Sequence, residues 1–154
     1  MNTKTAILPT SKEIKAFLDG YGWTYKETPS DDGKEVVVSS FSVGDKSRGI
    51  LVSFVAEGEF VLVSTIELLK NVPSNFSQRF LELNDTVKLV KLYTVTQNNP
   101  DTIDVDLGFE LWNESWNKKT FYSFMDMLCL GAEKALNIVN SENIPHETNF
   151  ITYS

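Results

Sequence analysis

The strongest structural signal in the chain is a pair of apolar runs separated by only three residues. ILVSFVA (50–56) and FVLVSTI (60–66) are rich in β-branched and aromatic side chains, and EGE (57–59) joins them. Such side chains favour strands. A connection this short links neighbouring antiparallel strands. The sequence therefore predicts an antiparallel sheet that contains this hairpin.

Four further segments have the composition of strands and are bounded by turn residues. The predicted strands are WTYKET (23–28), KEVVVSSFSV (34–43), VKLVKLYTVT (87–96) and TIDVDLGFELW (102–112). Polar turns are expected at SDDG (30–33), GDKSRG (44–49) and QNNPD (97–101). Together with the hairpin, these segments make six predicted strands.

Two helices are predicted from apolar residues at helical spacing. The first starts after Pro9, with Thr10 and Glu13 as a capping-box pair, and stops at Gly20 or Gly22. Its expected buried face is Ile14, Phe17, Leu18 and Tyr21. The second starts around Pro73 and ends near Asn84-Asp85, and its expected buried stripe is Phe76, Phe80, Leu81 and Leu83.

A third and longer helix is predicted over about 117–140. Asn117 is a natural N-cap, and Trp116 and Phe121 form a hydrophobic staple around it. The expected buried face is Phe121, Met125, Leu128, Ala132, Leu136 and Val139. About 24 residues correspond to roughly 36 Å of helix.

The predicted elements follow the order α-β-β-β-β-α-β-β-α in a chain of 154 residues. This order indicates an α+β fold in which helices pack on a mostly antiparallel sheet. We expect a single domain over residues 9–141, between flexible termini at 1–8 and 142–154.

Charge and cysteine content argue against several kinds of partner. The net charge is −7, and the longest basic run is Lys118-Lys119. Nucleic acids and anionic membrane surfaces both attract basic patches, so neither is an expected partner. The single cysteine, Cys129, excludes an intrachain disulfide, and no apolar run approaches the roughly 20 residues that span a bilayer. A cytoplasmic location is expected.

The segment TIDVDLGFELW presents Asp104, Asp106 and Glu110 on one face of a strand, because side chains alternate. Its apolar residues then face the core. Asp104 and Asp106 lie roughly 7 Å apart along a strand, and a metal ion would need a third ligand from elsewhere. The acids are interpreted as a solvated strand face rather than as metal ligands or catalytic carboxylates.

The same segment also predicts the register of its pairing with 87–96. If paired residue numbers sum to 199, Leu92 lies opposite Leu107, and Tyr93 lies beside Asp106. Lys91 then lies diagonal to acids of the neighbouring strand, a weakly stabilising arrangement.

No residue forms a convincing catalytic group. Cys129 is expected to be a buried, inert thiol, and His146, the only imidazole, lies in a proline-flanked tail. GDKSRG precedes a strand rather than a helix, so it is not a phosphate-binding loop. The sequence predicts a protein without enzymatic activity, cofactor or metal.

Two possible binding regions involve the last helix. Met127 and Leu130 lie opposite its apolar stripe, and Gly131 lies mid-helix, where glycine costs about 1 kcal/mol relative to alanine. Close approach of another element would explain the exposed apolar residues and the glycine. That element is either a loop or the C-terminal tail of the same chain, or it belongs to another subunit or a partner. The second region is a pocket between the sheet and this helix, although such aromatic residues are more often core. Its candidate lining residues are Phe109, Trp112, Trp116 and Phe121.

A pattern across 79–95 and 103–135 resembles a known family. A helix ends in Leu83-Asn84, and a strand, a turn and a strand closing in Glu110-Leu111 follow. A short loop then leads to the helix capped by Asn117, with Ala132 and Ala135 in its second half. This pattern resembles the YbjN-like family, whose members are provisionally labelled bacterial sensory transduction regulators. LWNESW and YSFMDM are more aromatic than the family's usual Leu/Glu-rich segments.

The resemblance implies a fold and a kind of function. The family is similar in fold to type III secretion chaperones and supplies no catalytic residues. It implies a non-enzymatic, protein-binding adaptor or chaperone-like regulatory module of the bacterial cytoplasm, often a homodimer. A partner segment would bind as a helix in a groove or as an added strand. The alternative hypothesis is a small-ligand sensor that uses the aromatic pocket.

Overall fold

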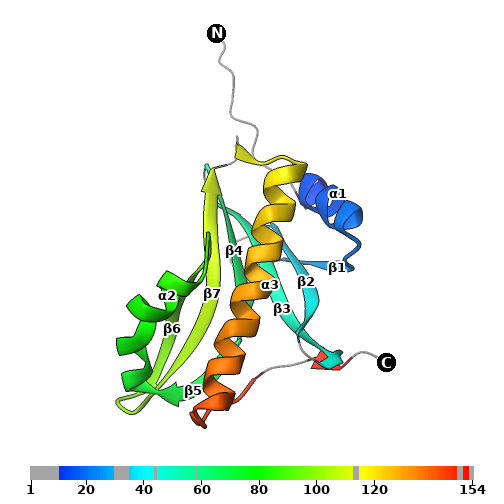
Figure 1. The fold of residues 1–154 in the computed structure, drawn as a ribbon. Helices are drawn as coiled ribbons and strands as arrows, with labels where there is room; N and C mark the ends of the chain where they lie inside the picture. The colour runs from blue at the N-terminus through cyan, green and yellow to red at the C-terminus, as the bar shows by residue number, and fades with distance from the viewer. Residues whose placement is uncertain are drawn as a thin grey trace.

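The structure, a computed structural model, describes residues 11–29, 35–43, 45–57, 59–112, 115–148 and 151–152. In this part of the chain an antiparallel sheet packs against α-helices, as Figure 1 shows. The first elements are α1 (Ser11–Tyr21), β1 (Tyr25–Pro29), β2 (Glu35–Val43), β3 (Asp45–Glu57), β4 (Phe60–Ile66) and β5 (Leu69–Pro73). The 3-10 helix η1 (Ser74–Arg79), α2 (Phe80–Thr86), β6 (Lys91–Asn99), β7 (Thr102–Trp112), α3 (Lys118–Ser141) and β8 (Ile151–Thr152) follow. The predicted α+β class and long C-terminal helix are confirmed.

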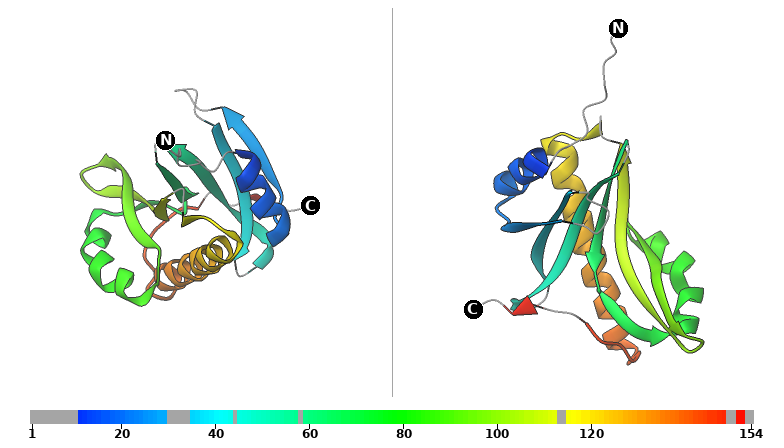
Figure 2. Two further views of the ribbon diagram at one scale, coloured as in Figure 1. Left: turned by 90° about the horizontal axis from the view of Figure 1, so that it is seen from above. Right: turned by 180° about the vertical axis from the view of Figure 1, so that it is seen from behind.

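Strands β1 to β4 are neighbours in chain order, and β7 lies next to β4. β5 pairs with the N-terminal part of the same β7, and β6 also pairs with β7. The strands form an arc, and α3 lies inside this arc (Figure 2). Consequently α3 covers one face of the sheet, and it lies behind the strands in the view from behind (Figure 2, right).

The core lies between this concave face and the helices. Phe17 of α1 stacks on Phe121 of α3 with 5.2 Å between ring centroids, and Phe121 stacks on Phe54 of β3 at 5.9 Å. Every residue of the predicted apolar face of α3 is buried, as are Ile14 and Leu18 of α1. The Thr10–Glu13 capping pair and the side chain of Tyr21 lie outside the described residues.

Helix ends follow the predicted signals. The Asn117 Oδ1 atom accepts a hydrogen bond from the Thr120 amide over 2.9 Å, which confirms the N-cap of α3. At the end of α1, Gly22 adopts a left-handed φ of 90° and its amide donates to the Leu18 carbonyl over 2.9 Å. Glycine enters this conformation without steric cost, so Gly22 rather than Gly20 ends the helix.

The predicted register between β6 and β7 is confirmed. Leu92 pairs with Leu107, and Tyr93 pairs with Asp106. The register shifts after Thr94, where β6 carries an irregularity. Beside the start of β6, the Asn84 side chain of α2 accepts from the Leu92 amide (2.7 Å) and donates to the Leu92 carbonyl (3.3 Å). Asn84 therefore covers a backbone position on the open edge of this strand.

The segment after β4 differs from the predicted helix. Residues 69–73 form β5, 74–79 form a 3-10 helix, and only 80–86 form an α-helix. Leu81, predicted in the buried stripe, is 90% exposed. The predicted stripe assumes one continuous α-helix with about 3.6 residues per turn. The 3-10 helix η1 has about 3.0 residues per turn, so one buried stripe does not continue from η1 into α2.

The predicted turn at 44–49 is shorter than expected, because residues 45–49 belong to β3. Ser42 of β2 pairs with Gly49 on one side, and β8 pairs with Arg48 and Gly49 on the other. Backbone pairing on both sides of this part of β3 thus outweighs its polar composition, which favours a turn. The predicted turn at 30–33 and the predicted flexible segment 1–8 lie outside the described residues.

The C-terminal segment, predicted to be flexible over 142–154, contacts the sheet at two places. The Lys70 amide donates to the Glu147 carbonyl over 2.7 Å, and the Glu147 amide returns a bond to the Lys70 carbonyl over 2.8 Å. Further along, Thr152 pairs with Arg48. Open strand edges provide these hydrogen-bond partners, so the tail follows the sheet despite its proline and polar residues.

Candidate functional site

The three predicted interface residues on α3 do not share one surface. Gly131 is buried, and a Cβ atom added there would lie 2.8 Å from Leu107 Cδ2 and 3.1 Å from Val90 Cγ2. The element that approaches this glycine therefore belongs to the same chain. Met127 is partly buried against the core, whereas Leu130 is 43% exposed. Leu130 is the member of this trio whose side chain is available to a partner.

The predicted pocket aromatics separate into two groups. Trp116 contacts Phe109 and Phe121 with centroid separations of 6.3 and 5.6 Å, so these three rings lie together between the sheet and α3. Trp112 is 48% exposed and instead stacks on Phe60 at 4.2 Å. The Trp116 Nε1 atom is buried and has no hydrogen-bond partner among the described residues. Binding of a ligand beside the rings of Trp116, Phe109 and Phe121 stays a prediction.

Asp106 does not lie on a solvated face, so that interpretation is wrong for this residue. β4 separates from β7 beyond Ser64, and β5 starts at Leu69. Where the strands separate, Asp106 is only 6% exposed and accepts bonds from Thr65 Oγ1 and the Leu68 amide, both over 2.8 Å. Burial raises the pKa of Asp106 to about 6, and these hydrogen bonds oppose that rise.

Asp104, nearer the start of β7, has a similar structural role. It is half-buried and accepts bonds from the Asn71 amide (2.9 Å) and from Asn98 Nδ2 (2.8 Å). Glu67 and Asn71 both have a φ of 54°, an unusual conformation for residues other than glycine. The two aspartates thus bind backbone amides exposed by the irregular passage from β4 to β5. No group of metal-ligating side chains occurs within the described ranges.

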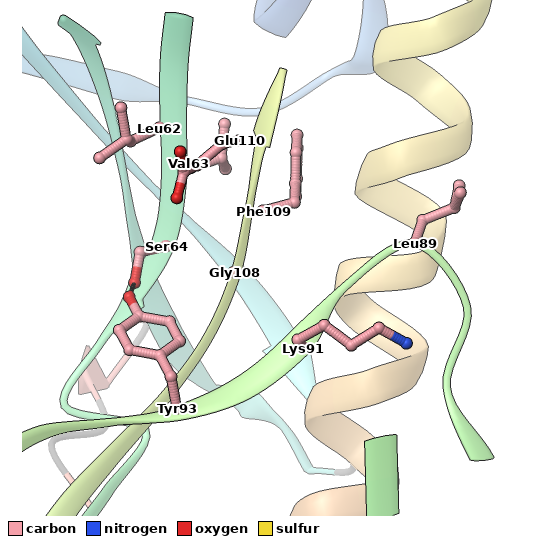
Figure 3. Close-up of a pocket in the computed structure, with 9 residues that line it drawn as sticks. All are labelled: Leu62, Val63, Ser64, Leu89, Lys91, Tyr93, Gly108, Phe109 and Glu110. Atoms are coloured by element: carbon pink, nitrogen blue, oxygen red, sulfur yellow. Dashed lines mark hydrogen bonds between the residues drawn. The ribbon is translucent and has the colours of Figure 1, made fainter. Parts of the chain in front are cut away.

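Glu110 is exposed as predicted, and it lines a hollow of about 480 Å³ beside Gly108 of β7 (Figure 3). The lining residues come from β4, β6, β7 and the turn before β6: Leu62, Val63, Ser64, Leu89, Lys91, Tyr93, Gly108, Phe109 and Glu110. Binding sites for small molecules commonly occupy about 300–1,000 Å³. This hollow is therefore large enough for a small molecule or for a few residues of an extended peptide.

Gly108 gives the hollow its floor. A Cβ atom on Gly108 would lie 2.4 Å from the Val63 carbonyl oxygen and 3.1 Å from Ser64 Cα, so β4 and β7 approach each other too closely for a side chain. Above this glycine, the Tyr93 ring of β6 reaches across to Ser64 of β4, and the two hydroxyl groups form a hydrogen bond (Figure 3). Burial raises the pKa of Tyr93, which therefore remains a neutral phenol.

Lys91 does not neutralise Glu110, although it pairs with Gly108 on the adjoining strand. Its Nζ atom donates to the Asn84 carbonyl over 3.0 Å and points away from Glu110 (Figure 3). Within the described part of the chain, Glu110 has no ion pair. The hollow thus combines apolar walls with one exposed carboxylate and with Lys91, whose ammonium group is bound to the Asn84 carbonyl.

The sequence places Glu110 on a wet strand face and Phe109 in a pocket against the last helix, and it does not predict this hollow. Tyr93 was predicted beside Asp106, yet its reach to Ser64 depends on the glycine between them. Gly108 within a strand was the available signal, because such a glycine often marks close approach of another backbone.

Cys129 and His146 are the other two reactive side chains that the sequence singles out. Burial raises the pKa of Cys129 to about 12, with Asp126 and Glu133 adding to the effect, so its thiol stays protonated at neutral pH. The His146 Nδ1 atom lies 2.8 Å from the Ile144 carbonyl oxygen of the same tail. No helix of the described chain is long and apolar enough to span a membrane.

Fold and site together define a small α+β protein in which helices pack on an antiparallel sheet and an open hollow lies beside Gly108 of β7. The structure is similar to the crystal structure of YbjN from E. coli, a candidate transcription regulator, with a TM-score of 0.64. The sequences are 12% identical, and the match covers 91% of this chain and 98% of YbjN. Neither a family model nor a curated protein sequence matches the chain. The resemblance to YbjN noted from the sequence is thus confirmed at the level of the fold.

Proposed function

We propose that this chain is a non-enzymatic adaptor or regulatory module of the bacterial cytoplasm that binds a segment of another polypeptide. The observation that carries the proposal is the hollow above Gly108. Leu89 at its border is 51% exposed, and Trp112 lies two residues beyond Glu110 along β7. Exposed apolar side chains around a concavity are typical of binding surfaces. The fold shared with a candidate transcription regulator is compatible with such a role.

Site-specific photo-crosslinking tests this proposal. A photoreactive phenylalanine analogue would replace Leu89 at the hollow or, as a control, Leu81, which is exposed on α2. In bacterial cells expressing each variant, we expect a defined polypeptide adduct from position 89 and none from position 81. Leu62→Asp in the position-89 variant should abolish the adduct, provided that circular dichroism shows a folded chain. Absence of an adduct at position 89, or equal adducts at both positions, would contradict the proposal.

The assembly that we propose is a homodimer through the exposed side of α3 around Leu130. Multi-angle light scattering measures the mass directly. A dimer that becomes a monomer after Leu130→Asp would support this assembly, whereas a wild-type monomer would contradict it.

A small-ligand sensor is the second candidate, and it is favoured by the Trp116 indole, which has no hydrogen-bond partner within the described ranges. A buried donor without an acceptor is unfavourable, and a ligand with an acceptor oxygen would satisfy it. A thermal-shift screen with metabolites tests this function, with Trp116→Phe as the variant that lacks the donor. A stabilising compound should lose its effect in the variant, and a screen without stabilising compounds would exclude this candidate.

A further inference from the structure

We propose that the hollow above Gly108 binds a polypeptide segment in which an arginine or lysine lies between apolar residues, with the basic group on Glu110. The inference rests on the proposed protein-binding function and adds the chemistry of the partner. Three features of the described residues carry it: the apolar walls, the unpaired carboxylate, and the aromatic pair beyond it.

The walls favour apolar side chains of the partner. Leu62 lies opposite Glu110 in the β4–β7 pairing, and Leu89 lines the same hollow from the turn before β6. Tyr93 closes one end, where its hydroxyl group is already occupied by Ser64, so it presents mainly its ring to a ligand. A segment with aliphatic residues would remove these surfaces from water, which is the main driving force of most protein association.

The carboxylate of Glu110 specifies a positive charge on the partner residue that lies between the two apolar ones. Lys91 of the adjoining strand lines the same hollow, but its ammonium group donates to the Asn84 carbonyl. Among the residues that the structure describes, Glu110 is consequently left without a counter-ion. A partner's guanidinium or ammonium group would supply one, and charged hydrogen bonds of this kind are stronger than neutral ones.

The next outward-facing residue along β7 adds a second attraction for a cation. Trp112 follows Glu110 on the same strand face, and it stacks on Phe60 of β4. An indole face attracts a positive charge through its ring electrons, most strongly for arginine. An acidic or neutral segment would lack both interactions.

The net charge of −7 argues against a second copy of the chain in this hollow. Two copies approaching with Glu110 at the contact would each bring a carboxylate to a surface already negative overall, and like charges disfavour association. A basic segment is complementary both to the hollow and to the whole molecule.

NMR titration of isotope-labelled protein with synthetic peptides tests the inference. The probes are Ser-Gly-Leu-Arg-Leu-Gly-Ser and the same peptide with glutamine in place of arginine. We expect the arginine peptide to shift the amide signals of Gly108 and Glu110. Glu110→Gln should lower the affinity for the arginine peptide about five- to tenfold, the loss expected for a partly exposed charged hydrogen bond. The affinity for the glutamine peptide should not change. The control is Glu133→Gln, which removes the same charge from an exposed position on α3 and should change neither affinity.

The outcomes separate this inference from the proposed function. If both peptides bind the hollow equally in the wild type and in Glu110→Gln, the assigned charge is wrong while the protein-binding function stands. If neither peptide shifts the signals of the hollow, the proposed partner chemistry is overturned, and crosslinking at position 89 decides the function independently. Shifts of the same signals with protein concentration alone would show that a second copy occupies the hollow and would also overturn the inference.

Discussion

Asp106→Asn is expected to remove an electrostatic penalty that the folded chain carries at neutral pH. Asp106 is buried where β4 and β5 separate, and it accepts bonds from Thr65 and from the Leu68 amide. Asparagine has nearly the same shape, and its Oδ1 atom is able to accept both bonds. The substitution therefore replaces a group that ionises with one that stays neutral, while the two hydrogen bonds to Oδ1 are kept.

The expected magnitude follows from the pKa of Asp106. This pKa is about 6 in the folded chain, above the ordinary value of 3.8, so the folded state holds the proton more tightly than the unfolded state. The stabilisation from proton binding is complete at pH values below 3.8 and is lost as the pH rises through about 6. One pKa unit corresponds to about 1.36 kcal/mol, so this group lowers the free energy of unfolding by roughly 3 kcal/mol between acid and neutral pH.

Urea unfolding of the wild type and of Asp106→Asn across this pH range measures the effect. The variant should gain stability relative to the wild type as the pH rises, by up to roughly 3 kcal/mol near neutral pH. Glu133→Gln provides a control for the loss of one negative charge from the chain. The pKa of Asp106 is 3.8 at its ordinary value and about 6 in the folded chain, so pH 4.5 and pH 7 lie on either side of the folded-state value. A stability difference between the two proteins that is the same at both pH values would refute the reasoning.

Three further substitutions test the packing and hydrogen bonds described above. Gly131→Val should lower the free energy of unfolding by about 1–3 kcal/mol because the new side chain would overlap Leu107, and an unchanged urea midpoint would contradict this packing. Asn117→Ala should cost about 0.5–2 kcal/mol through loss of the N-cap of α3, measured by thermal unfolding, and an unchanged melting temperature would argue against capping. Asn84→Ala should increase self-association in dynamic light scattering by uncovering the Leu92 backbone, and equal particle sizes would count against a covering role.

The elements predicted correctly are those whose signals lie within the element itself. The apolar face of α3 follows from the spacing of its own residues, and its start follows from Asn117. β7 and its register with β6 follow from strict alternation, because a slip of one residue would turn Leu107 away from the core. Such signals need no knowledge of distant parts of the chain.

The features that were missed depend on contacts between distant segments. β5 follows an irregular passage in which Glu67 and Asn71 take unusual backbone conformations, and the amides of Leu68 and Asn71 donate to Asp106 and Asp104 of β7, respectively. Alternation alone therefore assigned Asp106 to a wet face. The hollow likewise depends on a glycine of β7 that lets the Tyr93 ring of β6 reach β4.

The Asn84 side chain has a consequence for how this protein behaves at high concentration. An uncovered strand edge invites another strand to add by backbone hydrogen bonding, which leads to fibrous aggregates. Asn84 occupies both backbone groups of Leu92, and the irregularities of β6 interrupt the regular spacing that an incoming strand would need. A chain protected in this way is able to keep the exposed apolar residues of the hollow without polymerising through its edge strand β6.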